Sequence, residues 1–314
     1  MISIIICTFN RRYLLEKMLK SILAQNFDEY EIIIVNDCSN DDTLEYLSNF
    51  INYKNFKIIN NKINLGLVSS RIIGIRYAKF EYVIQLDDDD EMYPNCLIKY
   101  SSILKKYKFD FLISDYTINA TKIKDKDDDY SLIHYDNFYN LPDYKMHPRA
   151  IWAHIIKTKK AKLVYDNLDL KQNYGEDLIF LSNIYKISDN FGYANFNSIN
   201  YSKKANSMTN LTKMNYAGIL EYCNCHCYIP LVWGKNTFPT NIMNLISLNF
   251  RYFSFKIFEK QLSEYQLNQM KKKFIKCYEG FDFELMQKIA TKKYQMSKRF
   301  YNFTNKKFLY YINE

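Results

Sequence analysis

The sequence lacks the features that would carry the chain into or across a membrane. Its 314 residues contain no run of about 18 apolar side chains, so we expect no segment that spans a bilayer. The first residues, Met1–Ile6, have neither a basic start nor a long apolar stretch, so we expect no signal peptide. The 7 cysteines are odd in number, and without an export signal they indicate reduced thiols and a cytoplasmic protein.

Glycine-rich nucleotide loops are also missing. The chain has only 7 glycines, and none form Gly-x-Gly-x-x-Gly or Gly-x4-Gly-Lys-Ser/Thr. Those two patterns hold phosphates in Rossmann dinucleotide sites and in P-loops, because their backbones can approach the phosphates closely. The sequence therefore supports neither class of site.

Short apolar runs alternate with helical patterns in the first part of the chain. We predict strands at 3–7, 31–35, 57–59, 82–86, 109–113 and 196–201. We predict helices at 13–25, 41–50, 68–78 and 94–106, and a further helix that follows Gly175–Asp177 and continues to residue 187. Strands alternating with helices predict an α/β fold with a parallel sheet.

Polar residues follow three of these strands directly. They are the loop Thr8–Arg12, the pair Asn36–Asp37 and the run Asp87–Asp90. Ligands of such sheets bind beyond the carboxyl ends of the strands, so we expect the three clusters to share one crevice. Four adjacent carboxylates fit a hard divalent cation, and a solvated acidic loop is the alternative.

Together these motifs resemble the family-2 inverting nucleotide-sugar glycosyltransferases. The resemblance covers residues 1–210 and rests on five segments in order: Ser3–Arg11, Glu31–Thr43, Asn64–Gly74, Leu86–Asp90, which resembles the DxD motif, and Gly175–Asp177. It implies a GT-A fold, in which helices flank a mixed, mainly parallel sheet, with a mostly helical extension at 211–314.

The resemblance also implies the chemistry. A nucleotide-sugar donor, most often UDP-linked, would bind with Mn²⁺ or Mg²⁺ held by Asp89 and Asp90, and Asp177, or Glu176 in its place, would be the base of an inverting transfer. The donor-binding residues would be Thr8, Asn10, Arg12, Asp37, Arg71, Asp87, Asp89 and Lys204. Asp88 and Glu91 are expected to be bystanders.

The sequence departs from the family pattern at a few positions. Asn36 and Cys38 replace Asp and Gly, so the turn there is less permissive, and Ile72 stands where Asn is frequent. Lys204 takes the place of a histidine that can bind the metal. Our hypothesis is that Lys204 contacts the diphosphate as a point charge.

The net charge of +9 comes from the C-terminal region. Residues 235–314 contain 15 Lys+Arg and 6 Asp+Glu, whereas the first 234 residues have 28 of each. Three alternatives stay open for this region: nucleic-acid binding, which no recognised motif supports, a solvated helical face, or peripheral contact with the inner face of the cytoplasmic membrane. Cys223–Cys227 has an unusual spacing for zinc, and buried thiols are the preferred interpretation.

The preferred function is transfer of a sugar to a hydroxyl of a glycan or lipid-linked glycan acceptor in bacterial surface polysaccharide or lipooligosaccharide synthesis. A sugar-nucleotide nucleotidyltransferase would carry a Gly-rich loop after the first strand, which Thr8–Arg12 lacks. A non-catalytic nucleotide-sugar-binding module is disfavoured because Asp37, Asp89, Asp90 and Asp177 are all present. Trp152 could stack on a sugar ring or pack in the core, and His154 is expected to be structural.

Overall fold

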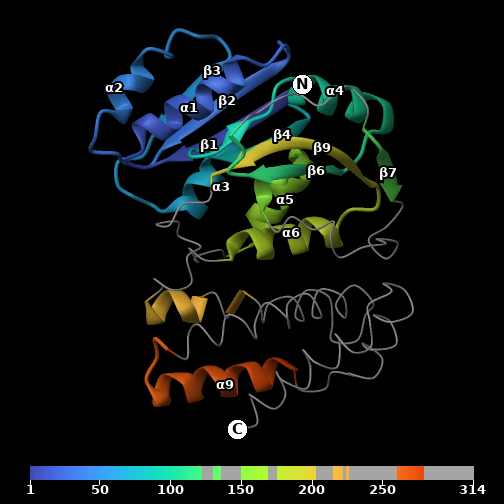
Figure 1. Ribbon diagram of the computed structural model, residues 1–314. Coiled ribbons are helices and arrows are strands. Elements are labelled where there is room, and N and C mark those ends of the chain that lie inside the picture. The colour runs from blue at the N-terminus through green and yellow to red at the C-terminus, as the bar shows by residue number, and fades with distance from the viewer. Residues whose placement is uncertain are drawn as a thin grey trace. The chain divides into compact units, whose positions relative to one another are not determined.

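The computed structural model divides the chain into two compact units (Figure 1). It describes residues 1–121, 130–135, 150–168, 175–202, 215–221, 224–225 and 260–278. The first unit comprises 1–137, 148–171 and 187–204, and the second comprises 138–147, 172–186 and 205–314. The boundary predicted at residue 210 falls outside the described residues.

A mixed sheet forms the centre of the first unit, as Figure 1 shows. Its nine strands are ordered β3-β2-β1-β4-β8-β6-β9-β5, with β7 paired to β9. Strands β1 to β4 are mutually parallel, β6 is parallel to β9, and β8 runs antiparallel between β4 and β6. The strands are β1 (Ile2–Thr8), β2 (Tyr30–Asn36), β3 (Phe56–Asn60), β4 (Tyr82–Asp87), β5 (Glu91–Met92), β6 (Phe111–Ile118), β7 (Leu132–Tyr135), β8 (His154–Lys157) and β9 (Phe191–Tyr201).

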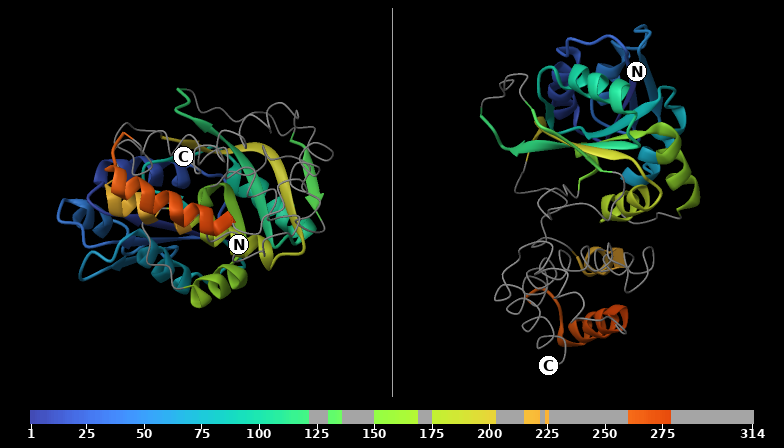
Figure 2. Two further views of the ribbon diagram at one scale, coloured as in Figure 1. Left: turned by 90° about the horizontal axis from the view of Figure 1, so that it is seen from below. Right: turned by 90° about the vertical axis from the view of Figure 1, so that its right-hand side faces the viewer.

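Helices cover both faces of this sheet, and the two views of Figure 2 show them on either side. Side chains alternate along β1, so Ile4 and Ile6 face one core and Ile5 faces the other. The first core contains the apolar faces of α1 (Arg12–Leu23), α2 (Thr43–Ser48) and α4 (Cys96–Tyr107). Helices α3 (Leu67–Tyr77) and α5 (Thr158–Asn167) contact each other, and α3 lies against β1 and β2.

A glycine allows α3 to lie this close to the sheet. A Cβ atom built on Gly74 would lie 2.6 Å from Cγ2 of Ile5 and 3.3 Å from Cγ2 of Val35. No real side chain tolerates the shorter contact, because the Ile5 methyl group is itself fixed in a packed core. The close approach brings Arg71, one turn before Gly74, over the carboxyl end of β4.

The predicted fold class is confirmed, with differences in detail. The strands of the first four βα units and their helices lie within a few residues of the predicted positions. Strand β9 begins at Phe191 instead of 196, and β6 extends to Ile118. Strand β8 and helix α5 were not predicted, and the antiparallel β8 makes the sheet mixed.

The described residues of the second unit fall into four short segments, 175–186, 215–221, 224–225 and 260–278. Helix α6 spans Glu176–Lys186, residues 216–221 are helical, and α9 spans Glu264–Tyr278, within the extension expected to be mostly helical. Gly175 has a φ of +75°, and a Cβ atom there would lie 2.8 Å from the Cβ of Cys225. Most of the extension at 211–314 lies outside the described residues. None of the helices in the described segments is long and apolar enough to cross a membrane.

Candidate active site at the carboxyl ends of the strands

The three polar clusters predicted to share a crevice lie at one edge of the sheet. Cys7 pairs in register with Asp87, and Thr8 pairs with Asn36, so the ends of β1, β2 and β4 are level. The loops that leave these strands therefore begin side by side. Their convergence, predicted from topology alone, is what the structure shows.

Each of the first two aspartates in the run is bound by an arginine. Nη2 of Arg71 donates to Oδ1 of Asp87 at 2.8 Å, and the Arg71 side chain is only 4% exposed. Nη1 of Arg11 donates to Oδ1 of Asp88 at 3.0 Å and lies 3.7 Å from Oδ2 of Asp89. Arg11 comes from the loop after β1 and Arg71 from α3, so the run is held from two elements.

Asp90 is the most deeply buried of the four and is incompletely bonded. It is 1% exposed, and its Oδ1 accepts the backbone N–H of Ser202 at 2.9 Å. Its Oδ2 is buried and has no hydrogen-bond partner among the described residues. Burial, with the nearby charge of Asp87, raises the pKa of Asp90 to about 8. A buried carboxylate oxygen without a partner is costly, so Asp90 is a candidate ligand-binding residue.

Asp88 is also buried, and its environment differs from that of Asp90. Burial raises the pKa of Asp88 to about 6, while the adjacent Arg11 guanidinium acts in the opposite direction. Asp88 is 3% exposed, whereas a bystander residue would be expected to lie in solvent. Its burial against Arg11 gives it a definite structural place.

The residues of this run fit a hard divalent cation. Asp89 and Asp90 offer carboxylate oxygens, the ligands that Mg²⁺ and Mn²⁺ prefer, and Oδ2 of Asp90 lacks a partner. Within the described segments, no three His, Cys, Asp or Glu side chains converge as a complete metal site. Two carboxylates suffice for a cation whose other ligands are water and the phosphates of a substrate.

Asp37 organises the loop beyond β3. Its Oδ1 accepts from Nδ2 of Asn61 at 2.8 Å and from the backbone N–H of Leu65 at 2.9 Å, and its Oδ2 accepts from the N–H of Gly66 at 2.8 Å. Gly66 has a φ of +84° and precedes α3. Asp37 therefore fixes the entry to the helix that carries Arg71, and its predicted contact with the nucleotide stays a prediction.

The loops after β1 and β2 are bonded to each other. The backbone N–H of Asn10 donates to Oγ of Ser39 at 2.9 Å, and the N–H of Asn40 donates to Oδ1 of Asn10 at 2.8 Å. Cys38, where the family pattern has glycine, has a φ of +65°. The turn thus requires the left-handed conformation that glycine adopts most easily, and Cys38 adopts it with strain.

The structure brings some predicted donor-binding residues to the aspartates and places others elsewhere. Thr8, Arg71, Asp87 and Asp89 lie at this edge, whereas Arg12 pairs with Glu16 at 3.2 Å and with Asp42 at 3.8 Å. Its neighbour Arg11, which the sequence reasoning missed, contacts the aspartates instead. The i,i+4 spacing of Arg12 and Glu16 could have indicated that Arg12 pairs with Glu16 on the helix and not with the aspartates.

The predicted base, Asp177, and its alternative, Glu176, lie at the start of a helix of the second unit. Asp177 and Glu176 are the first two residues of α6, where the helix dipole favours negative charge. Gly175 precedes them in the left-handed conformation, as a break before the helix requires. Lys204 lies outside the described residues, as do His147, Trp233, Cys223, His226 and Cys227.

Two residues that could have belonged to a sugar site belong to the core. Trp152 is buried and stacks on Tyr201, with ring centroids 5.5 Å apart. His154 is buried in β8, and its Nδ1 bonds to the carbonyl of Ala150 at 3.1 Å. Both are explained by packing, as the structural alternative predicted.

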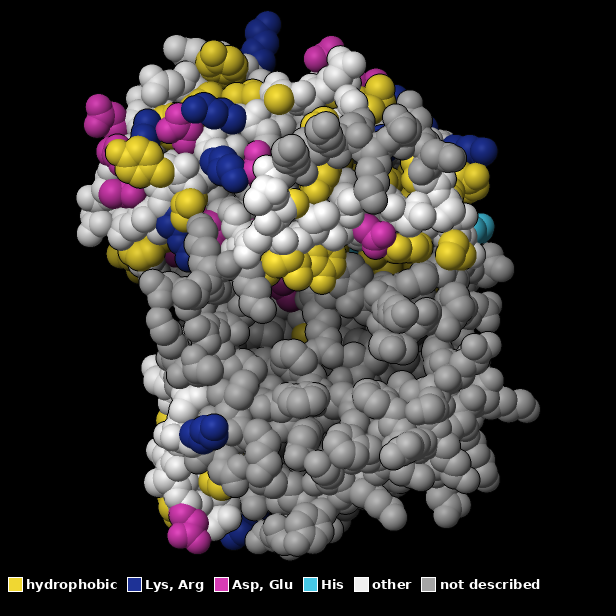
Figure 3. Space-filling model, viewed as in Figure 1, with side chains coloured by type: hydrophobic (Ala, Val, Ile, Leu, Met, Phe, Trp, Pro, Cys, Tyr) yellow, Lys and Arg dark blue, Asp and Glu magenta, His cyan; other side chains and the backbone are white. Residues whose placement is uncertain are grey.

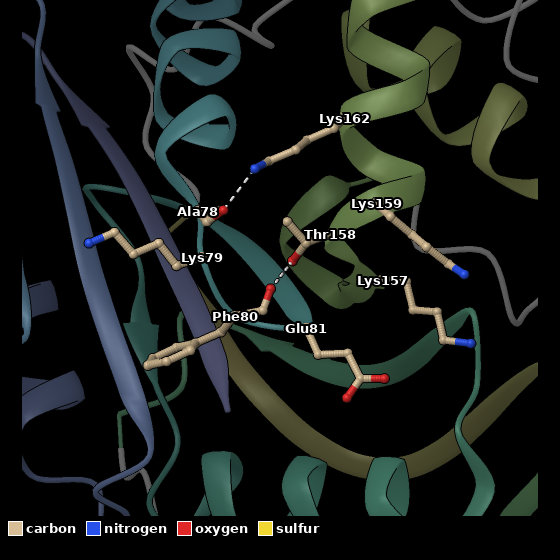
Figure 4. Close-up of a pocket in the computed structure, with 8 residues that line it drawn as sticks. All are labelled: Ala78, Lys79, Phe80, Glu81, Lys157, Thr158, Lys159 and Lys162. Carbon is tan, nitrogen blue, oxygen red and sulfur yellow. Dashed lines mark hydrogen bonds between the residues drawn. The ribbon is translucent and has the colours of Figure 1, made fainter.

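A pocket of about 400 Å³ lies at the opposite end of β4 (Figure 4). Two side chains of its lining join neighbouring elements: Nζ of Lys162 donates to the carbonyl of Ala78 at 2.8 Å, and Oγ1 of Thr158 donates to that of Phe80 at 2.6 Å. Lys157 is paired with Asp110. These groups tie α5 to the start of β4, far along the strand from Asp87.

The surface of the first unit mixes charges of both signs. Figure 3 shows Lys and Arg side chains lying among Asp and Glu side chains on the described part of one face. Pairs such as Lys20–Glu16 at 2.8 Å and Lys17–Glu91 at 2.7 Å account for part of this pattern. The mixture agrees with the balanced charge of the first 234 residues.

A family model, "Glycosyl transferase family 2", matches residues 3–166, which contain the strands and loops described above. The chain belongs to glycosyl transferase family 2. This membership accounts for the shared edge of β1, β2 and β4. It favours a glycosyltransferase over the sugar-nucleotide nucleotidyltransferase considered from sequence.

Two curated relatives are similar to parts of the chain. A cholesterol galactosyltransferase of Borreliella burgdorferi is 30% identical over 233 residues, covering 68% of this chain and 64% of the relative. A GalNAc(5)-diNAcBac-PP-undecaprenol beta-1,3-glucosyltransferase of Campylobacter jejuni is 37% identical over 111 residues, covering 33% of this chain and 34% of the relative. The chain therefore spans less than two thirds of the length of these relatives.

A solved structure has the same fold as this chain. The crystal structure of S. aureus TarS residues 1–349 in complex with UDP-GlcNAc matches with a TM-score of 0.71 at 16% identity, covering 98% of this chain and 88% of that chain. At this identity the likeness establishes the GT-A fold, which confirms the fold implied by the sequence motifs.

Proposed function

We propose that the protein transfers a sugar from a nucleotide-diphosphate donor to a hydroxyl group of a glycan or lipid-linked acceptor, with inversion at the anomeric carbon. The observation that carries the proposal is Asp90, a buried carboxylate with an unpartnered oxygen, in a run of aspartates at the carboxyl end of β4. TarS, which has the same fold, is bound to UDP-GlcNAc in its crystal structure, and this supports a UDP-sugar donor.

The strand ends would hold the donor. Thr8 at the end of β1 and Asp37 directly after β2 would contact the nucleoside, with Asn10 nearby in the loop after β1. Arg71 and Asp87 form a pair at the next strand end, beside the expected place of the diphosphate. Fixed hydrogen bonds orient Asn10, Asp37 and the Arg71–Asp87 pair before a donor arrives, so little reorganisation of these groups is needed on binding.

Asp89 and Asp90 would hold the divalent cation, Mn²⁺ or Mg²⁺. When bound, the cation supplies positive charge that stabilises the departing diphosphate. The chain's own contribution is to bury Asp90 and to fix its carboxylate by the bond from Ser202, so that the oxygen left over has a defined position. Charge that is placed before the reaction favours the transition state over the ground state.

Asp177 would accept the proton of the acceptor hydroxyl, with Glu176 as the alternative base. A single base and direct displacement lead to inversion, in which the acceptor oxygen forms the new bond as the bond to the diphosphate breaks. General bases of this kind contribute about 10²–10⁴-fold to the rate. Both carboxylates begin α6, and Gly175 lets the chain turn sharply just before them.

The acceptor class is inferred from the relatives. By name, the Borreliella burgdorferi enzyme glycosylates cholesterol and the Campylobacter jejuni enzyme acts on an undecaprenol-linked glycan, so both use acceptors with a lipid part. We extend this to a role in bacterial surface polysaccharide or lipid-linked glycan synthesis. The basic region 235–314 would then contact anionic lipid at the inner face of the cytoplasmic membrane.

The test is a panel of UDP-, GDP- and CMP-sugars incubated with the full chain and Mn²⁺, with release of the free nucleotide as the readout. We expect a UDP-sugar to be turned over and chelation of Mn²⁺ to stop the reaction. The variant Asp177→Asn should lower turnover by about 10²–10⁴-fold and leave donor binding intact. If no nucleotide sugar is bound or hydrolysed under any condition, the proposed function is wrong.

A further inference from the structure

Two arginines contact the run of four aspartates, and they lie nearest to its first two carboxylates. Asp87 is bonded to Arg71 at 2.8 Å, and Asp88 to Arg11 at 3.0 Å. Asp89 lies 3.7 Å from the same Arg11 nitrogen, and Asp90 bonds only a backbone N–H through one oxygen. The run therefore presents two neutralised pairs followed by the two carboxylates that the proposed function assigns to the cation.

We propose that Arg11 and Asp88 form a positioning pair, which turns Asp88 inward and limits how strongly the run binds a cation before the nucleotide arrives. The proposal rests on the proposed function, because it concerns the cation of that same site. It gives Asp88 a role in place of the bystander expected from sequence, and it adds Arg11 to the residues that shape the site.

The burial of the pair supports this role. Asp88 is 3% exposed, so its carboxylate points into the protein, whereas the Arg11 side chain is 40% exposed. A buried charge is stable only when it is paired, and Arg11 is the ion-pair partner of Asp88 among the described residues. The guanidinium thus holds the second aspartate away from solvent and places positive charge beside Asp89.

The position of Arg11 in the chain makes the arrangement specific. Arg11 precedes α1, so its side chain is free to turn toward the strand ends, while Arg12 lies in the helix and pairs with Glu16. The bond from Arg11 spans 77 residues of sequence and joins the loop after β1 to the turn after β4. A cation that bound without the diphosphate would have to overcome this positive charge.

Charge changes at the pair therefore have opposite effects on cation binding. Arg11→Gln removes positive charge beside Asp89, so Mn²⁺ should bind the nucleotide-free protein more tightly, by about five- to tenfold from Coulomb's law in a watery site. Asp88→Asn removes the closer of the two carboxylates that Arg11 contacts and leaves its charge to Asp89, so Mn²⁺ binding should weaken by a similar factor. The double variant Arg11→Gln/Asp88→Asn restores the charge of the run and should bind Mn²⁺ within about twofold of the wild type.

The experiment measures free Mn²⁺ by electron paramagnetic resonance in titrations of the full chain, with and without UDP, at low ionic strength. Arg76→Gln is the matched control, because Arg76 pairs with a single exposed carboxylate, Asp166, at 3.7 Å. It should leave Mn²⁺ affinity unchanged. Arg11→Lys, which keeps the charge, should behave like the wild type, and thermal unfolding identifies any variant that fails to fold.

The outcomes separate the two claims. If wild-type protein binds no Mn²⁺ even with UDP, the proposed function fails and this inference fails with it. If wild-type protein binds Mn²⁺ with UDP but Arg11→Gln affects affinity no more than Arg76→Gln, or lowers it, the positioning pair alone is wrong. The two single variants should also cancel each other in the double variant Arg11→Gln/Asp88→Asn. If the double variant bound Mn²⁺ much more weakly than the wild type, the positioning pair would be contradicted.

Discussion

The Asp37 loop and the Asp87–Asp90 turn lie at the same edge of the sheet, and each contains a buried carboxylate. The two carboxylates differ in how many hydrogen bonds they accept. Asp37 accepts three hydrogen bonds at 2.8–2.9 Å, from one side chain and two backbone N–H groups. Asp90 accepts one from the backbone of Ser202, and its second oxygen has none. Satisfied carboxylates stabilise the fold, whereas an unsatisfied one is retained at a cost to stability. The comparison distinguishes a structural aspartate from a functional one.

The largest expected effect is the loss of activity in Asp90→Asn. An amide cannot replace a carboxylate as a cation ligand, so turnover of the UDP-sugar should fall by about 10²–10³-fold, as when other preorganised charged groups are removed. The assay is nucleotide release at saturating Mn²⁺. Protein that keeps more than a tenth of wild-type turnover would mean that Asp90 is not a ligand.

The second effect is the loss of stability in Asp37→Asn. The amide nitrogen cannot accept the N–H of Gly66 or Leu65, so at least one buried donor is left unpaired. Unfolding by urea should show a loss of about 2–4 kcal/mol, the range for charged hydrogen bonds that are broken in a buried site. Asp90→Asn serves as the comparison and should show no such loss. Equal losses in both variants would remove the distinction between the two regions.

The third prediction concerns pH. The pKa of Asp90 is raised to about 8 from an ordinary value of 3.8, so the folded protein keeps a proton that the unfolded chain releases. Asp90 therefore favours folding at low pH, and this contribution is lost as the pH rises through 8. With metal chelated, Asp90→Asn should be about as stable as wild type at pH 4 and progressively more stable toward pH 8. The difference should grow by at most about 1.4 kcal/mol per pH unit.

The control for the pH experiment is Asp89→Asn, which removes a neighbouring carboxylate that is 20% exposed. The same measurement on this variant separates the loss of any carboxylate in the turn from the loss of Asp90 itself. A stability difference between Asp90→Asn and wild type that stays constant over this range would show that Asp90 titrates normally.

The smallest expected effect is at Cys38, in the Asp37 loop. Its φ of +65° is unfavourable for a residue with a side chain, so Cys38→Gly should stabilise the protein by about 0.5 kcal/mol after the greater backbone freedom of glycine is subtracted. Cys38→Ala keeps the Cβ atom and should bring no gain. Equal stabilities of the two variants in chemical unfolding would show that the turn is not strained.

The sequence was sufficient for the parallel core of the fold. Continuous runs such as Ser3–Cys7 and Glu31–Val35 are typical of buried parallel strands, and the helices between them carry regular apolar spacing. Strand β8 has only four residues, His154–Lys157, which is too short to show a period. The following α5 has few apolar residues, so its pattern was equally weak.

The topology of the sheet predicted where the candidate site lies, but the sequence reasoning did not predict which arginine contacts the aspartates. Parallel strands end at one edge, so the convergence of Thr8, Asp37 and Asp87 followed from their positions after strands. The choice between Arg11 and Arg12 depended on the residue at which α1 begins, and helix ends are the least certain part of a sequence prediction. Two of the three hydrogen bonds that distinguish Asp37 from Asp90 come from backbone N–H groups, which no side-chain pattern reveals.

The central claim is that the Asp87–Asp90 turn holds the leaving diphosphate through a divalent cation. The most direct test is binding of UDP to the full chain, followed by ³¹P nuclear magnetic resonance, with Mn²⁺ and with chelator. The account predicts that Mn²⁺ tightens UDP binding and broadens both phosphorus signals of the bound nucleotide, and that Asp90→Asn abolishes the tightening. Identical UDP affinity with Mn²⁺ and with chelator would contradict it.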